Sequence, residues 1–299
     1  MPTLESLGLA EAPRDHPLTY PGAWPRESGI LDGDRYLPLP AGPPPDFAGL
    51  FPDRVPVLAV GSNACPGQLR HKMAEFGIRE PIPMTLVRIT GIEVGVSAHV
   101  SRLGYVSASP FNAPGTVREL FVTWVDAAQL AVIDASEGVT VPTGPYDRAW
   151  LSSPEVDVEL ESGERLFGVY AYVNRRGVLH DGSGSPRRHP GEHRLLTELL
   201  GGSPGLRDLF GLTPEEFCAR ARFDRDRCDR GTRLFAAEGL VVASGLEPYV
   251  LEPRALETHV PETHVPETHV PDTHVPGPHL PDQQTGSPGT GASLSPPLR

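Results

Sequence analysis

The amino-acid sequence predicts an α+β fold: a mostly antiparallel β core with flanking helices and a helical C-terminal addition. Strand-like segments follow one another with turn signals between them, instead of alternating regularly with helices. From Pro190 onward the pattern becomes helical. Prolines gather at the two ends of the chain, with ten in residues 1–45, eleven in 247–299 and fourteen in the 201 residues between. The folded part is therefore expected in the middle.

The first segment, residues 1–54, is a proline-rich N-terminal arm punctuated by stretches such as LPLPAGPPPD. Such stretches favour polyproline II structure and turns over helix. We expect a loosely attached arm. The alternative is that Tyr20, Trp24 and Tyr36 dock onto the folded part and cover some of it.

The core begins with an apolar run, Val55–Val60, which predicts a buried strand closed by the turn Gly61-Ser62-Asn63. Residues 66–76 predict a helix, because Pro66 suits a helix start and apolar residues recur on one face. Asp126 is a predicted N-cap for a short helix that runs to residue 134. The other segments expected to be strands are Met84–Ile89, Gly91–Ser97, Gly104–Ser107, Glu119–Val125, Tyr146–Leu151, Val156–Leu160 and Arg165–Val173.

The helical part contains three predicted helices, over His193–Leu200, Gly205–Phe210 and from Thr213 onward. Thr213 and Glu216 have the spacing of a capping box. Acidic residues interleave with the arginines of 220–233, which predicts a salt-bridged helix face.

Composition argues against several classes of protein. No run of 18 apolar residues is present, and the N-terminus lacks the basic and apolar regions of a secretory signal, so we expect no membrane association and a cytoplasmic protein. Cys65, Cys218 and Cys228 form no CxxC pair, which disfavours a disulfide scaffold or a cysteine zinc site. The formal charge of −12 disfavours nucleic-acid binding. Lys72 is the sole lysine, which we interpret as a compositional bias toward arginine.

The last segment, residues 247–299, contains a five-residue repeat of the ETHVP type over 257–281, with a histidine in each copy. In an extended chain that rises about 3.1 Å per residue, successive histidines lie roughly 15 Å apart, too far to share one metal ion. We expect a disordered tail. Weak metal or partner binding by the tail is the alternative.

The turn after the first core strand is the first candidate site. A strand that leads directly into a helix offers free backbone N–H groups to a carboxylate or oxyanion. Gly61 permits close approach of a ligand, and Ser62 and Asn63 add side-chain donors. Taken alone, the triplet also fits an ordinary capped turn.

Val60-Gly-Ser-Asn63 resembles the Y-G-S-N-L loop of the γ-glutamylcyclotransferase-like proteins. Ile133-Asp-Ala-Ser-Glu137-Gly138 resembles the L-D-x-x-E-G signature of that family, and Tyr146-Asp-Arg148 its Tyr-x-Arg. The resemblance covers residues 55–175, which leaves 176–246 as a loop and helical addition packed on the core. Val60 stands where the family usually has Tyr, so the substrate of the family does not transfer directly.

The resemblance implies a barrel-like β core and an intramolecular acyl transfer that needs neither metal nor cofactor. The α-amine of a small-molecule γ-glutamyl substrate attacks its own γ-carbonyl, which releases 5-oxoproline and an amine. Glu137 is the implied catalytic general acid/base. Val60, Gly61, Ser62 and Asn63 are the implied substrate-binding residues. Tyr146 either joins them or packs in the core.

Other residues give weaker signals. Asp134, three residues before Glu137, is expected to be a water-exposed acid at a helix end, with a carboxylate dyad as the alternative. His189 and His193 are spaced as metal ligands on a helix, but Pro190 and Gly191 make a continuous helix through them improbable. Cys65 is expected to be a buried thiol with no catalytic role.

The sequence therefore leaves three hypotheses for function. The first is a γ-glutamylcyclotransferase-like enzyme. The second is a non-catalytic protein that keeps the fold and a small-ligand pocket. The third is another small-amide reaction at the same site. Protein partners and oligomeric state stay unknown at this point.

Overall fold

The computed structural model describes residues 2–39, 53–152 and 156–252. These residues all belong to the first of the two units into which the chain divides, residues 1–265. The ETHVP-type repeats and their histidines lie outside the described residues, so the expected tail stays a prediction.

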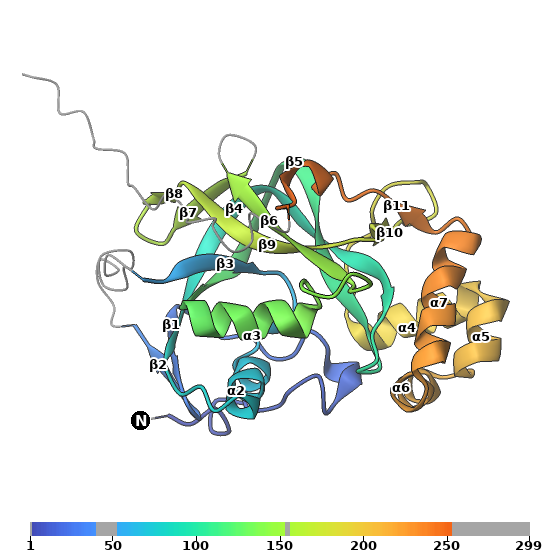
Figure 1. Cartoon of the computed structure of the whole chain (residues 1–299), viewed down its shortest axis with the longest axis horizontal. Coiled ribbons are helices and arrows are strands. Elements are labelled where there is room, and N and C mark those ends of the chain that lie inside the picture. Colours follow the sequence, from blue (N-terminus) through green and yellow to red (C-terminus); the bar gives the residue numbers. More distant parts are fainter. Residues whose placement is uncertain (1, 40–52, 153–155, 253–299) are drawn as a thin grey trace, which may run out of the picture. The chain divides into compact units, whose positions relative to one another are not determined.

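The secondary structure is mixed, as expected for an α+β protein (Figure 1). The strands are β1 Gly29–Asp32, β2 Arg35–Pro38, β3 Val55–Ala59, β4 Ile82–Val100, β5 Val106–Val125, β6 Tyr146–Ser152, β7 Asp157–Leu160, β8 Arg165–Leu166, β9 Gly168–Asn174, β10 Val178–Leu179 and β11 Val241–Val242. The α-helices are α2 Pro66–Glu75, α3 Ala127–Glu137, α4 Glu192–Gly202, α5 Pro204–Phe210, α6 Pro214–Phe223 and α7 Arg225–Ala237, and the 3-10 helices are η1 Pro17–Thr19, η2 Ser62–Ala64 and η3 Glu247–Tyr249.

One sheet contains these strands, with the main path β11-β10-β4-β5-β3-β9-β6. Its centre is the long β4–β5 hairpin, in which the four short strands expected over residues 84–125 merge into two. The hairpin continues through a register shift between Thr90 and Gly91, which explains why a break was expected there. Only the β3–β9 pair is parallel among the described strands.

The sheet is not closed into a barrel, so the barrel-like core that we expected is wrong in this respect. No pairing among the described residues joins the terminal strands β6 and β11. The outer edge of β6 is instead occupied by the chain after η3, where Ala149 bridges Val250 and the N–H of Leu251 donates to Arg148 O. That segment thus covers the middle of the β6 edge.

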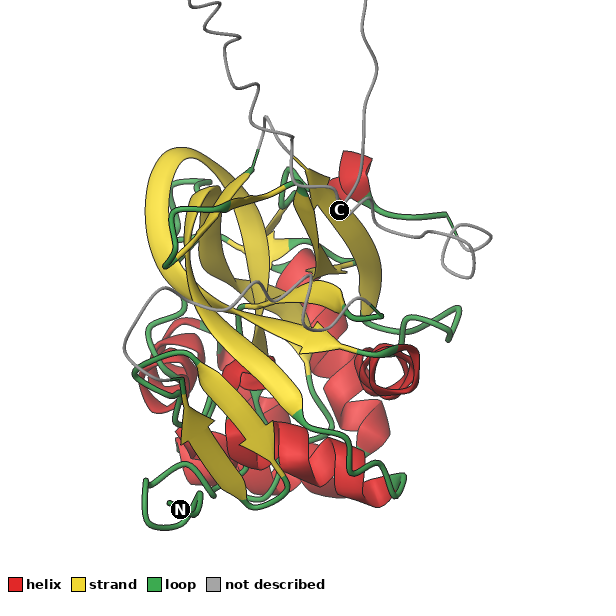
Figure 2. Cartoon of the chain, turned by 90° about the vertical axis from the view of Figure 1, so that its left-hand side faces the viewer, coloured by secondary structure: helices red, strands yellow, loops and turns green. Residues whose placement is uncertain are grey.

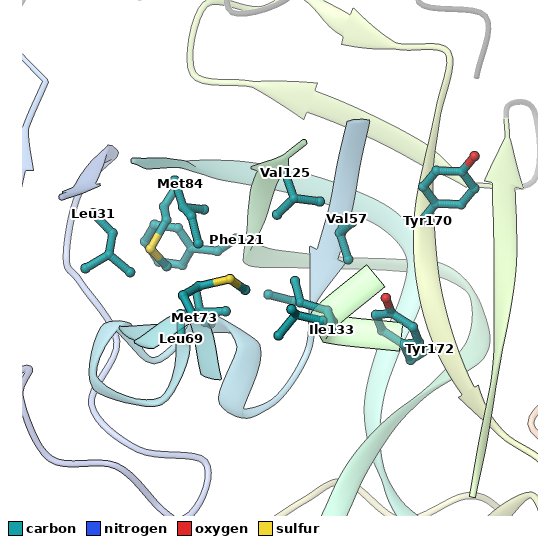
Figure 3. Close-up of a cluster of buried hydrophobic side chains, with 14 of the residues drawn as sticks. Leu31, Val57, Leu69, Met73, Met84, Phe121, Val125, Ile133, Tyr170 and Tyr172 are labelled. Carbon is teal, nitrogen blue, oxygen red and sulfur yellow. The ribbon is translucent and has the colours of Figure 1, made fainter. Parts of the chain in front are cut away.

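Helices α2 and α3 pack against the sheet through a buried apolar cluster (Figure 3). Leu69 and Met73 of α2 and Ile133 of α3 point into it and meet side chains of the strands, including Phe121 and Met84. Figure 2 shows the α-helices gathered on one side of the curved strands. Burial of this apolar face fixes α2 and α3 beside each other, which is what positions the site described below.

The N-terminal segment is not a loosely attached arm. Strand β1 pairs with β4, with Gly29 opposite Met84, and Leu4, Tyr20 and Tyr36 are buried. Leu4 and Tyr36 belong to the same apolar cluster as α2, and Trp24 packs against it. Enough apolar side chains are present to hold this segment on the core despite its prolines, as the docking alternative predicted.

The C-terminal helices form a second apolar cluster with the end of the β4–β5 hairpin. Thr213 caps α6 as predicted, since its Oγ1 accepts from Glu216 N at 3.3 Å. The capping box is incomplete, because Glu216 Oε2 accepts from the N–H of Leu212 instead. The arginine-rich stretch forms two helices, with the ion pairs Arg220–Glu216 at 3.7 Å and Arg227–Asp224 at 3.5 Å.

Candidate functional site

The Gly61-Ser62-Asn63 turn begins one residue after the end of β3 and opens η2. The carbonyls of Gly61 and Ser62 accept the first η2 bonds, from the N–H groups of Ala64 and Cys65. The N–H groups of residues 62 and 63 precede these bonds, as at the start of any helix. A side chain at position 61 has no room, because a Cβ there would lie 2.3 Å from the hydroxyl of Tyr20. The glycine is required by this contact.

A network of three side chains joins this turn to α2 and α3. Asn63 Nδ2 donates to Glu137 Oε1 at 3.1 Å, and Asn63 Oδ1 accepts from Lys72 Nζ at 2.8 Å. Lys72 Nζ also donates to Glu137 Oε1 at 2.9 Å. The Asn63 side chain, expected to bind a ligand, is therefore engaged in holding Glu137. Within the described part of the chain Glu137 Oε2 has no hydrogen-bond partner, which leaves one oxygen for a ligand.

Two local features place Glu137. Asp126 caps the N-terminus of α3 in a full capping box with Gln129. Glu137 is the last residue of α3, and Gly138 ends the helix with φ +74°. Ordinary residues adopt this conformation only at a cost, so the E-G pair of the sequence is explained by a glycine stop directly after the acid.

Lys72 is the member of this network that our sequence reasoning missed. It is 7% exposed, although lysine is among the residue types that are least often buried. A compositional bias toward arginine explains why lysine is scarce in this chain. It does not explain why the one lysine is buried beside Glu137. The signal was available, because the sole lysine lies on the predicted helix that follows the Gly61-Ser62-Asn63 turn.

A cavity of about 740 Å³ lies beside this network. Its lining contains every residue predicted for the site, namely Val60, Gly61, Ser62, Asn63, Glu137 and Tyr146, together with Lys72. Glu137 thus lies in the same cavity as the turn and does not point into solvent on another face. The size is in the range of small-molecule sites.

Buried tyrosines form another part of the cavity wall. The hydroxyl of Tyr146 bonds to Ser107 Oγ at 2.7 Å and donates to Ala108 O at 3.1 Å. Tyr20 Oη accepts from Ala108 N at 2.8 Å, and its ring stacks on Tyr105 with centroids 4.4 Å apart. Burial raises the pKa of Tyr146 to about 12 and that of Tyr20 well above its ordinary value. These hydroxyls are therefore neutral hydrogen-bond donors at ordinary pH. Neither Tyr20 nor Tyr105 was predicted for the site from the sequence.

Asp134 is not the exposed helix-end acid that we expected. It is buried, receives a hydrogen bond from Arg148 Nη1 at 2.6 Å and accepts from the hydroxyl of Tyr172 at 2.8 Å. Arg148 is the arginine of the Tyr-x-Arg pattern and is itself buried. Because both oxygens of Asp134 are engaged by these partners, it forms a structural ion pair and no dyad with Glu137.

The remaining candidates lie apart from this chemistry. Cys65 is buried, as expected, and burial raises the pKa of its thiol. Helix α4 begins only at Glu192, so no helix passes through His189 and His193. Among residues 2–39, 53–152 and 156–252, no group of His, Cys, Asp and Glu side chains is arranged to hold a metal ion. No helix in these ranges is long and apolar enough to cross a bilayer.

No family model and no curated protein matches the chain. Solved structures that match include an uncharacterized protein from Homo sapiens, 17% identical over 40% of this chain and 66% of that one, with a TM-score of 0.28. A γ-glutamyl cyclotransferase is 14% identical over 67% of this chain and 94% of that one, with a TM-score of 0.33. YkqA from Bacillus subtilis is 17% identical over 59% and 56%, also at 0.33. The chain thus covers less than two thirds of the human protein and of YkqA. At these values the matches do not identify a reaction for this chain.

Proposed function

We propose that this protein is a cyclotransferase that acts on a γ-glutamyl amide and releases 5-oxoproline and an amine. The observation that carries the proposal is the arrangement of Glu137. One of its oxygens is held by Lys72 and Asn63, and the other is left without a described partner beside the cavity. The resemblance of residues 55–175 to the γ-glutamylcyclotransferase-like proteins supports the same reaction.

In the proposed reaction, Glu137 Oε2 takes a proton from the α-ammonium group of the substrate. The freed amine nitrogen attacks the γ-carbonyl carbon, which forms a new C–N bond and places negative charge on the carbonyl oxygen. The tetrahedral intermediate then breaks the original amide C–N bond. Glu137 returns its proton to the leaving nitrogen and then carries the second proton of the attacking nitrogen to the released amine, which departs as an ammonium ion. The ring amide is left neutral, and the carboxylate, having served as base and acid, is regenerated. Water is not consumed.

Each neighbour of Glu137 has a separate part in this proposal. Lys72 and Asn63 fix Oε1, so that Oε2 keeps one orientation relative to the cavity. The N–H groups at the start of η2 and the hydroxyl of Tyr20 are the donors for the carboxylate or the developing oxyanion of the γ-glutamyl group. Tyr146 holds Ser107 and Ala108 behind Tyr20.

Product identification tests this function. The full-length protein is incubated with γ-glutamyl amino acids, γ-glutamyl peptides and γ-glutamyl alkylamines, and 5-oxoproline, glutamate and free amine are quantified. The proposal predicts 5-oxoproline and amine in equal amounts. Glutamate in place of 5-oxoproline would identify a hydrolase. Binding without any product would identify the non-catalytic alternative.

A further inference from the structure

The cavity that holds Glu137 is also lined by a set of residues with no part in the reaction above. We call this set the arginine lobe: His99, Arg102, Arg176, Arg225 and Arg233. They come from the end of β4 and the turn after it, from the turn between β9 and β10, and from α7. Tyr105 and Ser107, at the start of β5, line the same cavity and connect the lobe with the tyrosine wall.

The lobe concentrates positive charge in a chain whose formal charge is −12. Four guanidinium groups line it together with one carboxylate, that of Asp229, a surplus of three positive charges. The cations nearer Glu137 are neutralised, since Lys72 pairs with Glu137 and Arg14 with Glu75 at 3.1 Å. The four lobe arginines form no ion pair with any carboxylate of the described residues. Their charge is available to a ligand.

The walls of the lobe are fixed to one another. Residues 225, 229, 232 and 233 recur on one face of α7, as their helical spacing requires. Thr232 Oγ1 accepts from the N–H of Val100 at 3.0 Å, and Cys228 Sγ contacts Ser101 O at 3.8 Å. These contacts hold α7 against the β4–β5 turn. The arginines of both elements therefore line the same cavity.

His99 adds an uncharged polar group to the lobe. Its Nδ1 is buried and has no hydrogen-bond partner among the described residues. Burial, together with Arg176 and Arg102 nearby, lowers the pKa of His99 to about 3, so the ring is neutral at ordinary pH. A buried nitrogen without a partner is costly, so this ring nitrogen is a polar group of the lobe wall that still lacks a hydrogen bond.

We propose that the arginine lobe binds a dianionic group on the amine half of the γ-glutamyl substrate, either a phosphate monoester or a pair of carboxylates. This inference rests on the proposed function, which places the γ-glutamyl half at Gly61–Asn63 and Glu137. A single carboxylate would neutralise only one of the three surplus charges. A dianion suits several guanidinium groups, whose planar donors pair with phosphate and carboxylate oxygens.

Matched substrates test the inference. γ-Glutamyl-phosphoethanolamine is compared with γ-glutamylethanolamine, from which it differs only by the phosphate. γ-Glutamylaspartate is compared with γ-glutamylalanine, from which it differs by one carboxylate. We expect a kcat/KM advantage of at least about tenfold for the dianion in one of the pairs, because charge-assisted hydrogen bonds to arginine are gained there. The pair that shows the advantage identifies the source of the dianion.

The variant Arg225→Gln/Arg233→Gln should reduce that advantage to about twofold or less, because two of the four guanidinium groups of the lobe are removed. Arg230→Gln is the matched control, because Arg230 is exposed on the same helix but does not line the cavity. This control should keep the full advantage. Equal kcat/KM for the members of both pairs in the unmodified protein would overturn the inference.

A binding measurement separates failure of the inference from failure of the proposed function. Calorimetric titration with inorganic pyrophosphate needs no turnover. We expect saturable binding to the full-length protein that is weakened at least about tenfold in Arg225→Gln/Arg233→Gln and unchanged in Arg230→Gln. Binding with this pattern but no 5-oxoproline from any substrate would overturn the proposed function alone. No binding, or binding unaffected by the double substitution, would overturn the lobe as an anion site.

Discussion

The carboxylate of Glu137 accepts hydrogen bonds from two side chains, one charged and one neutral. Lys72 supplies a full positive charge at 2.9 Å, and Asn63 supplies a neutral amide donor at 3.1 Å. Both reach the same oxygen, and both are buried. The pair therefore engages one oxygen of Glu137 and leaves the other without a described partner, and the ion pair also compensates the cost of burying each charge.

Replacing Lys72 with Met removes the charge but keeps much of the side-chain volume. We expect kcat/KM for 5-oxoproline release to fall at least about tenfold, because Glu137 loses its fixed orientation. The free energy of unfolding should fall by about 1–3 kcal/mol, since a partly buried carboxylate loses its charged partner. Lys72→Arg, which keeps the charge, should restore much of the stability. Full activity in Lys72→Met would show that the ion pair has no part in the reaction.

The hydroxyl group of Tyr20 donates no hydrogen bond to any described residue. Its oxygen accepts from Ala108, and its own proton has no described acceptor. Tyr20→Phe should therefore lower kcat about tenfold to a thousandfold, as expected for loss of one donor to an oxyanion. It should also cost about 1–3 kcal/mol of stability, because the buried N–H of Ala108 loses its acceptor. Tyr36→Phe is the control, because its hydroxyl also lies in the N-terminal segment but donates to Glu27 O, away from the cavity. Equal activity of the two variants would remove Tyr20 from the site.

His99 gives the protein a predictable sensitivity to acid. Its pKa of about 3 in the folded state lies below the ordinary value of 6.5, so below pH 6.5 the unfolded chain binds a proton that the folded chain does not. Stability is therefore lost as the pH falls from about 6.5 toward 3. Between pH 7 and pH 5, the free energy of unfolding of the unmodified protein should fall by about 2 kcal/mol more than that of His99→Gln. Chemical denaturation at the two pH values measures this difference. Parallel curves for the two proteins would contradict this.

At the scale of elements, the end of α3 links backbone geometry to the site. Gly138 has φ +74°, and a Cβ there would lie 2.8 Å from Cδ of Pro145. Gly77, just after α2, also has a positive φ, but a Cβ there would meet nothing within 4 Å. A substitution at either glycine would thus strain the backbone in the left-handed region. Only a substitution at Gly138 would also clash with a neighbouring residue.

Gly77→Ala should cost about 1 kcal/mol of stability, from the left-handed backbone conformation alone. Gly138→Ala should cost more, by about 1–3 kcal/mol, and should also lower kcat, because relief of the clash moves the end of α3 that carries Glu137. Thermal unfolding and 5-oxoproline assays of both variants measure the difference. If the two variants lose the same stability and activity, the loop at Pro145 moves to accommodate the added methyl group, and the predicted effect of the clash is wrong.

The positions of several helices and strands could be predicted from the sequence, because residues close to one another in the chain mark where they begin and end. Asp126 and Gly138 bound α3 as neighbours in the sequence, and the Gly61 turn ends β3 in the same way. Pairings between distant segments did not follow, because their signals are not local. Strand β1 pairs with β4 although prolines surround it, and residues after η3 bridge the outer edge of β6.

At the scale of the whole molecule, the site depends on segments that are distant in the chain. Ala108 and Tyr20 are 88 residues apart, and Glu137 lies 65 residues after Lys72. The Val60-Gly-Ser-Asn63 and Glu137-Gly138 motifs identified two walls of the cavity from sequence. Tyr20 and the arginines of α7 were beyond such reasoning, since only tertiary packing brings the N-terminal segment and α7 to this cavity. Lys72 was overlooked, although its place on the helix after the turn is visible in the sequence.

The most direct test of the central claim compares the unmodified protein with Glu137→Gln on one γ-glutamyl amide, with 5-oxoproline release measured under identical conditions. Glutamine keeps the shape and the hydrogen bonding of the side chain but cannot accept and return a proton. The account predicts that kcat falls at least about a hundredfold while the fold is retained, as expected for loss of a general acid/base. The control is Glu75→Gln, an acid that also lines the cavity but pairs with Arg14, and it should stay active. Unchanged turnover in Glu137→Gln would contradict the account.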